Sequence, residues 1–286
     1  MTENCWLERR VIGYAHQGGA REAPSSTLYA IERAISLGLP AIELDVHATA
    51  DRQLVVCHDP TLDRTTGRPG AIKDLSLEEL MAFDNAYFFV EGVDVVDDLP
   101  DEEYRYRGRA PADHRFGVAS LAEILESFPD AVLNLDIKKT APEVEPYEEL
   151  LADLLRHYDR RDDVIVASFD DTATDAFSRY APEIGTSAGT AATAAFFHFV
   201  HQGGELPESV SRHVALQVPA TYGEIVVVDE AFVEAAHRSG LAVHVWTVND
   251  RDEMEQLLDL GVDGIITDEP SVLQGLLGEK GVAWRP

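Results

Sequence analysis

Short apolar runs recur along the whole chain and alternate with segments that have the spacing and end signals of helices. Runs of strand length occupy residues 11–16, 41–47, 131–138, 164–169, 185–188, 215–218, 242–248 and 264–267. Helices are predicted over residues 25–38, 120–128, 143–158, 229–239 and 250–260, and glycines stand at several of the helix ends. Alternation of this kind predicts a parallel sheet, and eight strands favour its closure into an α/β barrel of the (β/α)8, or TIM-barrel, type.

Two segments interrupt the alternation. Residues 54–58 form a short predicted strand soon after the second strand, so Asp51 and Arg52 are expected at a hairpin tip near the barrel mouth. Residues from about 85 to 117 form a longer insertion that is first aromatic, then acidic and then basic. Long loops in compact domains are often functional, and we interpret this one as a lid. The prediction is one domain over residues 1–286, with a small insertion after the second strand region.

The composition narrows the choice of partners. The 52 acidic and 23 basic residues give a formal charge of −29, which repels nucleic acids and anionic lipid surfaces. We therefore expect neither nucleic acid nor stable membrane association, while the oligomeric state is left open. The sequence has no secretory leader and no apolar run of membrane-spanning length, so a cytoplasmic location is expected. Cys5 and Cys57 lack the spacing of a thiolate metal site and are expected to be free thiols.

Acidic residues occupy one face of two predicted strands. Glu43, Asp45 and His47 alternate with apolar residues that helices must cover, so the acidic face points into the barrel. Asp136 and Lys138 point inward from the third strand in the same way. Three carboxylates this close require a compensating positive charge. We predict one divalent cation, Mg²⁺ or Ca²⁺, held by Glu43, Asp45 and Asp136; a structural network with Lys138 is the alternative.

Two histidines stand where the active sites of such barrels lie. His16 ends the first strand and His58 ends the short hairpin strand, both at the carboxyl-terminal mouth. A lone histidine is more often structural, but two beside a cation site suit general acid and base roles near neutral pH. Lys138 is one of four lysines in the chain, and its ammonium group suits a phosphate oxygen.

These residues occur in motifs that resemble the glycerophosphodiester phosphodiesterases. The similarity spans nearly the whole chain in the right order, and its combined spacing is specific. The motifs are Ala15-His16-Gln17-Gly18-Gly19, Glu43-Leu44-Asp45-Val46, His58-Asp59-Pro60-Thr61-Leu62-Asp63-Arg64-Thr65-Thr66, Leu133-Asn134-Leu135-Asp136-Ile137-Lys138, Val245-Trp246-Thr247-Val248-Asn249 and Gly264-Ile265-Ile266-Thr267-Asp268.

The resemblance implies a metal-dependent phosphoric diester hydrolase with a TIM-barrel fold. Such an enzyme would convert small-molecule glycerophosphodiesters to an alcohol and glycerol 3-phosphate. The family pattern assigns acid–base catalysis to His16 and His58 and places Lys138 near the phosphate. It assigns one divalent cation to the three carboxylates named above. It also places Trp246 in the glycerol pocket, a role that the residue alone would not suggest.

The sequence departs from the family pattern at three positions. Gln17 stands where an arginine usually follows the first histidine, Ser25 where a glutamate usually follows the proline, and Asp136 where a glutamate usually binds the metal. Neutral Gln17 cannot fully replace the bidentate phosphate contact of an arginine. Loss of a cation and an anion together keeps the local charge balanced, so we expect a subfamily variant that is still active. Gln17 is expected to make a weaker polar contact than the arginine, with Arg64 or Arg21 compensating.

Two other functions fit the same motifs. A lysophospholipase D-like phosphodiesterase would need an apolar channel for an acyl chain. The apolar segment 191–200, together with Phe88 and Phe89 of the insertion, is the candidate lining. We expect burial of that segment instead, and a preference for soluble glycerophosphodiesters. A catalytically silent phosphate-binding barrel is suggested by Gln17 but opposed by both histidines and all three carboxylates.

Overall fold

Eight parallel strands close into a barrel, as the sequence predicts. The computed structural model describes residues 4–8, 11–138 and 146–282. The strands are β1 (Ile12–His16), β2 (Ala41–Ala48), β6 (Val132–Ile137), β7 (Val164–Ala167), β8 (Gly185–Ala188), β9 (Ala215–Pro219), β12 (Ala242–Trp246) and β13 (Gly264–Thr267). Each pairs with the next in this order, and β1 also pairs with β13, which closes the barrel.

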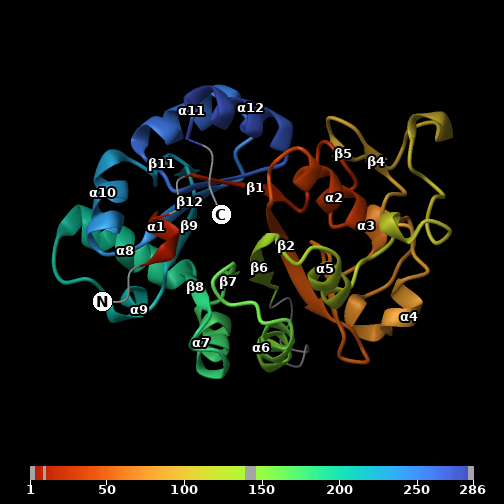
Figure 1. Ribbon diagram of the computed structural model, residues 1–286, viewed down its shortest axis with the longest axis horizontal. Helices are drawn as coiled ribbons and strands as arrows, with labels where there is room; N and C mark the ends of the chain where they lie inside the picture. The colour runs from red at the N-terminus through yellow and green to blue at the C-terminus, as the bar shows by residue number, and fades with distance from the viewer. Residues whose placement is uncertain (1–3, 9–10, 139–145, 283–286) are drawn as a thin grey trace.

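Helices surround the barrel (Figure 1). The longer ones are α2 (Leu28–Ser36), α5 (Leu121–Ser127), α6 (Glu148–His157), α7 (Asp171–Tyr180), α8 (Thr190–Gln202), α10 (Glu230–Arg238), α11 (Arg251–Leu260) and α12 (Pro270–Lys280). The five predicted helices are confirmed, although residues 143–145 of one prediction lie outside the described residues. Side chains of Thr27, Ser120, Asp229 and Asp250 cap α2, α5, α10 and α11, which fixes their first residues.

Shorter elements fill the connections between these strands and helices. They are α1 (Cys5–Glu8), α3 (Asp63–Thr66), α4 (Leu77–Leu80), α9 (Glu208–Ser211) and the 3-10 helices η1 (Ile72–Asp74), η2 (Asp101–Glu103) and η3 (His114–Phe116). The hairpin strands are β3 (Leu54–Val56), β4 (Phe89–Val90), β5 (Asp94–Val95), β10 (Thr221–Tyr222) and β11 (Ile225–Val226).

Alternation along β2 separates the core from the barrel interior. Ile42, Leu44 and Val46 are fully buried in an apolar cluster that also contains residues of α2 and α5. Glu43 and Asp45 take the opposite face and are buried as well. A separate apolar cluster lies inside the barrel, near the amino-terminal ends of the strands. It includes Trp6 and Tyr14. The inward polar residues of β2 therefore lie between this apolar cluster and the carboxyl-terminal mouth of the barrel.

The two interruptions of the pattern are built beside β2. β3 runs antiparallel to β2, and the turn between them contains Asp51 and Arg52. The insertion begins and ends at an antiparallel bridge between Asp84 and Gly117. With α3 and α4 it projects from one side of the barrel (Figure 1). Phe116 of the insertion stacks on Tyr29 of α2, with 4.7 Å between ring centroids, so the insertion is held by packing.

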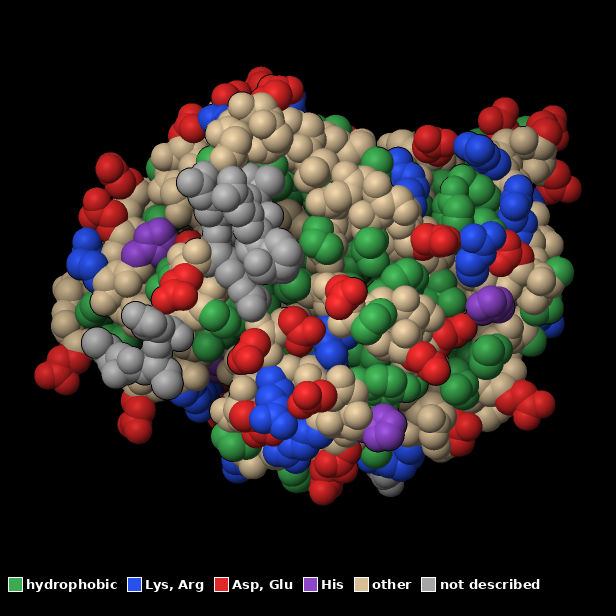
Figure 2. All heavy atoms as spheres, in the orientation of Figure 1, with side chains coloured by type: hydrophobic (Ala, Val, Ile, Leu, Met, Phe, Trp, Pro, Cys, Tyr) green, Lys and Arg blue, Asp and Glu red, His purple; other side chains and the backbone are tan. Residues whose placement is uncertain are grey.

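The surface reflects the acidic composition. Acidic side chains are spread around the edge of the face seen in Figure 2. Within residues 4–8, 11–138 and 146–282, none of the helices combines the length and apolar character needed to span a bilayer.

Candidate active site

Inward-facing side chains of β2 and β6 meet inside the barrel mouth. The register places Glu43 opposite Asn134 and Asp45 opposite Asp136. Lys138 follows β6, and its Nζ lies 2.8 Å from Asp45 Oδ1 and 2.9 Å from Asp136 Oδ2. The structure thus brings together the three predicted carboxylates and the predicted lysine, because strict alternation on two adjacent parallel strands points them into one space.

One ammonium group does not balance the charge of this cluster. Burial, followed by the charge of Asp45, raises the pKa of Glu43 to about 8 against the opposing effects of His16 and Lys138. Burial also raises the pKa of Asp136. Two buried oxygens, Asp45 Oδ2 and Asn134 Oδ1, have no hydrogen-bond partner among the described residues. Excess negative charge and unpartnered oxygens both call for a further positive group.

A hard divalent cation fits this donor set. Carboxylate and amide oxygens are the ligands that Mg²⁺ and Ca²⁺ prefer. In the described part of the chain, no three acidic, histidine or cysteine side chains are arranged as a metal centre, and Lys138 bridges Asp45 and Asp136. The carboxylates that pair with Lys138 are thus two of the three that the sequence predicts as cation ligands.

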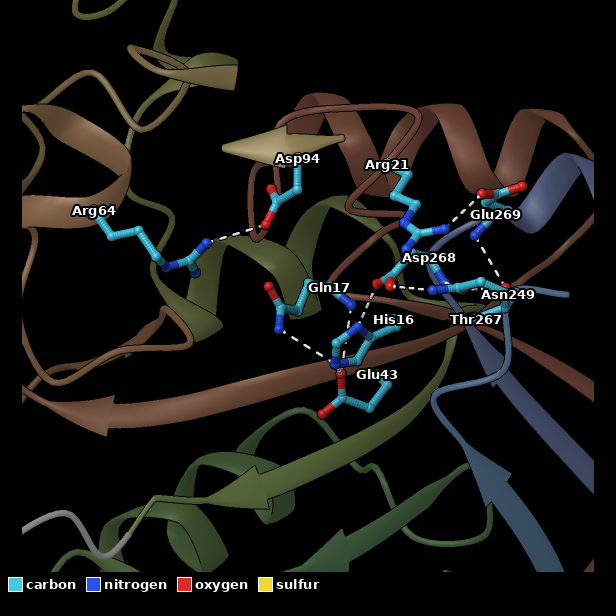
Figure 3. A network of polar contacts seen from close by, with 10 residues as sticks. All are labelled: His16, Gln17, Arg21, Glu43, Arg64, Asp94, Asn249, Thr267, Asp268 and Glu269. Atoms are coloured by element: carbon cyan, nitrogen blue, oxygen red, sulfur yellow. Dashed lines mark hydrogen bonds and ion pairs between the residues drawn. The ribbon is translucent and has the colours of Figure 1, made fainter. Parts of the chain in front are cut away.

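His16 is held by a carboxylate from the far end of the chain. Its Nδ1 lies 2.6 Å from Asp268 Oδ1, and Asn249 Nδ2 donates to Asp268 Oδ2 at 2.7 Å (Figure 3). His16 Nε2 lies 3.7 Å from Glu43 Oε2. Burial lowers the pKa of His16, but the hydrogen bond to Asp268 and the charges of Glu43 and Asp268 outweigh it and raise the pKa to about 9. Nδ1 is therefore tied to Asp268, and Nε2 faces the acidic cluster.

Gln17 lies directly against His16. Its backbone is left-handed, with φ 53°, and its N–H donates to Glu43 O at 2.9 Å. The side-chain Nε2 lies 3.3 Å from His16 Nε2. An amide nitrogen at this position can donate to Nε2 of neutral His16, whereas Nε2–H of protonated His16 would be accepted by the amide oxygen. Arg21 pairs with Glu269 at 3.0 Å, and Ser25 is buried.

His58 has a separate carboxylate partner. It follows β3, and its side chain is 44% exposed. Its Nδ1 lies 2.7 Å from Asp59 Oδ1, while Asp59 Oδ2 accepts from Arg64 Nε at 2.5 Å. Arg64 Nη1 also donates to Asp94 Oδ2 at 3.1 Å. The structure thus places Arg64, predicted to bind substrate, in contact with two carboxylates.

One aromatic ring lies beside the lysine, and a second packs against the first. Trp246 packs edge-on against Phe169 with 5.5 Å between ring centroids, and Lys138 Nζ lies 5.6 Å from the centre of the Phe169 ring. Phe169 is 58% exposed. Trp246, predicted to lie in the glycerol pocket, therefore reaches the lysine through Phe169.

Sequence reasoning gave no role to four residues that support these groups. Phe169 follows β7, Asp268 follows β13, Asn249 follows β12 and Asp59 follows His58. Their positions in the sequence could have identified them, because residues that directly follow barrel strands lie at the carboxyl-terminal mouth.

Two of the aromatic residues proposed for an acyl channel are buried, and the others are half-buried. Phe196 is fully buried, with its ring centroid 5.2 Å from that of Phe232 and 5.8 Å from that of Phe199. Phe89 is buried in the insertion, and Phe88 packs edge-on against Tyr87. The expected burial of segment 191–200 holds for Ala192 and Phe196, whereas Ala191, Ala194 and His198 are exposed. Phe196 and Phe89 belong to two separate apolar clusters.

Comparisons with known proteins identify the family to which the sequence is similar. The profile of the glycerophosphoryl diester phosphodiesterase family matches residues 16–272. A glycerophosphodiester phosphodiesterase of Caldanaerobacter subterraneus is 30% identical over 95% of this chain and 100% of its own length. Human lysophospholipase D GDPD1 is 25% identical over 92% of this chain and 85% of its own length.

Solved structures share the fold. A phosphodiesterase of Oleispira antarctica, solved with the product sn-glycerol-3-phosphate, has a TM-score of 0.69 at 21% identity and covers 94% of this chain and 97% of its own. A glycerophosphoryl diester phosphodiesterase domain from Mycobacterium tuberculosis has a TM-score of 0.77 at 19% identity, covering 93% of this chain and 99% of its own.

Proposed function

The chain belongs to the glycerophosphoryl diester phosphodiesterase family, and we propose that it hydrolyses glycerophosphodiesters to an alcohol and glycerol 3-phosphate. One observation carries this proposal. Two histidines at the barrel mouth each have Nδ1 bonded to a carboxylate. His16 Nε2 lies 3.7 Å from Glu43 Oε2 of the buried cluster, and His58 is close enough to lower the pKa of Asp136 electrostatically, against the larger effect of burial. That arrangement leaves Nε2 of each ring to exchange a proton with a substrate.

In this reaction one P–O bond forms and another breaks. We propose that His58 Nε2 takes the proton of the attacking oxygen, while His16 supplies a proton to the departing alcohol. His16 suits the donor role because Asp268 and Glu43 favour its protonated form. Asp268 and Asp59 hold the rings through Nδ1, so neither carboxylate needs to accept a proton.

We propose that Glu43, Asp45 and Asp136 hold one divalent cation, Mg²⁺ or Ca²⁺. Such an ion, when bound, neutralises the carboxylates and polarises a phosphoryl oxygen. Lys138 would then be released from Asp45 toward a second phosphate oxygen. Trp246, with Phe169, would pack against the glycerol carbons, and Gln17 would contact the substrate from beside His16. Arg64 retains further N–H donors for the substrate, since its two ion pairs use two of five.

We place the lysophospholipase D-like alternative second. One relative carries that name, but Phe196 and Phe89, which were considered for an acyl channel, are buried in two separate apolar clusters. The catalytically silent alternative is disfavoured because both histidine–carboxylate pairs are formed.

The test is a substrate screen with products identified by mass. Glycerophosphocholine, glycerophosphoethanolamine and matching lysophospholipids are incubated with the protein and Mg²⁺ or Ca²⁺. We expect glycerol 3-phosphate and free alcohol from the glycerophosphodiesters. Release of phosphocholine, or turnover of none of these diesters, would overturn the proposal.

A further inference from the structure

A row of alternately charged side chains joins the insertion to His58. His58 Nδ1 contacts Asp59 Oδ1 at 2.7 Å, Arg64 Nε donates to Asp59 Oδ2 at 2.5 Å, and Arg64 Nη1 donates to Asp94 Oδ2 at 3.1 Å. The first three residues belong to the connection after β3, whereas Asp94 begins β5 of the insertion. Figure 3 shows the Arg64 guanidinium pointing to Asp94, above Gln17. The insertion therefore reaches a catalytic candidate through ion pairs.

The backbone at Asp94 is held in an unusual conformation. Its φ is 101°, which is unfavourable for a residue with a Cβ. Val90 pairs with Asp94 in the β4–β5 hairpin, and Gly92 N–H donates to Arg21 O at 2.7 Å. The hairpin is thus tied to the loop after β1, which carries Gln17. A strained backbone conformation persists where surrounding contacts hold it. At Asp94 this conformation directs the carboxylate toward Arg64.

The guanidinium group of Arg64 is held in one orientation only when it bonds to both Asp59 and Asp94. A guanidinium is a rigid planar fork, and Arg64 uses Nε for Asp59 and Nη1 for Asp94. The bond to Asp59 alone would leave the plane free to turn about that contact. The hydrogen bond from His58, together with Arg64, outweighs burial and holds the pKa of Asp59 well below its usual range. Asp59 is therefore a carboxylate that bonds to both His58 and Arg64.

We propose that Asp94 is a positioning residue for catalysis. Asp94 holds Arg64, Arg64 holds Asp59, and Asp59 fixes the ring of His58 so that Nε2 faces the substrate. The insertion then contributes to catalysis through the orientation of His58. This role rests on the proposed function, because it assumes that His58 transfers a proton.

The variant Asp94→Asn tests this role with little change of shape. Asparagine tolerates positive φ and keeps the side-chain volume, but it loses the charge that holds Arg64. The matched control is Asp97→Asn, which makes the same change at an exposed position of the same insertion. Misplacement of a catalytic group can cost up to about 100-fold in rate, and we expect kcat of Asp94→Asn to fall about 10-fold. KM should rise less than kcat falls, through the substrate contact proposed for Arg64. The control should match wild type.

A double-mutant cycle separates positioning from general damage. If Asp94 acts through His58, Asp94→Asn should have no further effect on kcat in a His58→Ala background. A 10-fold loss that persists there, or a changed KM with unchanged kcat in the single variant, would overturn the proposal. Thermal unfolding of all variants shows that each protein is folded.

A measurement that does not depend on turnover distinguishes failure of the positioning role from failure of the proposed function. A histidine Nδ1–H bonded to a carboxylate gives a downfield proton NMR signal, and its loss in His58→Ala assigns it. We expect the signal to broaden through faster solvent exchange in Asp94→Asn and to stay sharp in Asp97→Asn. An unchanged signal in Asp94→Asn would refute the positioning role. Lack of diester turnover by the wild type would refute only the proposed function.

Discussion

Replacing Asp268 by asparagine tests whether the state of His16 governs catalysis. In wild type, Asp268 accepts from His16 through Oδ1 and from Asn249 Nδ2 through Oδ2 at 2.7 Å. Asn249 cannot turn over freely, because its Oδ1 accepts from Asp268 N–H at 2.9 Å and from Thr267 Oγ1 at 3.1 Å. An asparagine at 268 must therefore give its oxygen to Asn249 and its NH₂ group to His16.

The consequence for His16 follows from its ring nitrogens. An NH₂ group facing Nδ1 requires a lone pair there, which excludes the protonated ring and moves the remaining proton to Nε2. Imposing the wrong tautomer through one such substitution costs about 10⁴-fold in serine proteases, and loss of positioned acid–base catalysis costs at least about 10²-fold. We expect kcat of Asp268→Asn to fall within that range, measured with glycerophosphocholine at saturating cation.

The chain offers a matched control on the same strand. Asp263 precedes β13, as Asp268 follows it, and accepts from His237 Nε2 at 2.9 Å and from Val243 N–H at 2.8 Å. Asp263→Asn should cost about 1–3 kcal/mol in free energy of unfolding, because it weakens half-buried hydrogen bonds, and should leave kcat unchanged. A folded Asp268→Asn protein with kcat within threefold of wild type would refute the assignment of His16 as the proton donor.

The remaining predictions address other parts of the account. His58→Ala should lower kcat by at least about 10²-fold without loss of fold or metal, and near-normal kcat would remove its assigned role. Gln17→Arg alone should not raise activity, whereas addition of Ser25→Glu should rescue it; strictly additive effects in kcat/KM would show that the two positions are uncoupled. Phe196→Ala should destabilise the protein by about 3–5 kcal/mol in denaturant unfolding, since Phe196 is fully buried, and a much smaller loss would mean that this helix is loosely packed. The kcat/KM for glycerophosphocholine should exceed that for the matching lysophospholipid, and a tenfold reverse preference would favour a lysophospholipase D.

Much of the barrel could be predicted because local patterns encode it. Alternation in β2 and β6 was enough to place Glu43, Asp45 and Asp136 on one inward face. The helices α7 and α12 were not predicted. α7 contains several Thr, Ser and Asp residues with low helix propensity, and α12 contains Gly275 and Gly278. Packing against neighbouring elements stabilises both helices, and a single-sequence pattern does not show it.

The supporting contacts of the site could not be predicted from spacing. His16 and Asp268 are 252 residues apart, and Arg64 and Asp94 are 30 apart across the insertion. His16 and Asp268 meet because β1 pairs with β13 when the barrel closes. Arg64 and Asp94 meet because the insertion returns toward the connection after β3. Asp59 adjoins His58 in the sequence, but adjacency alone did not identify it as the partner of that ring.

The most direct test of the account follows the phosphorus atom in a single reaction. Protein freed of metal by a chelator is mixed with glycerophosphocholine, observed by ³¹P NMR, and then supplied with Mg²⁺ or Ca²⁺ in excess. The account predicts a stable diester signal before addition and its replacement by the glycerol 3-phosphate signal afterwards. Equal turnover before addition, or a diester signal that persists with either cation, would contradict it.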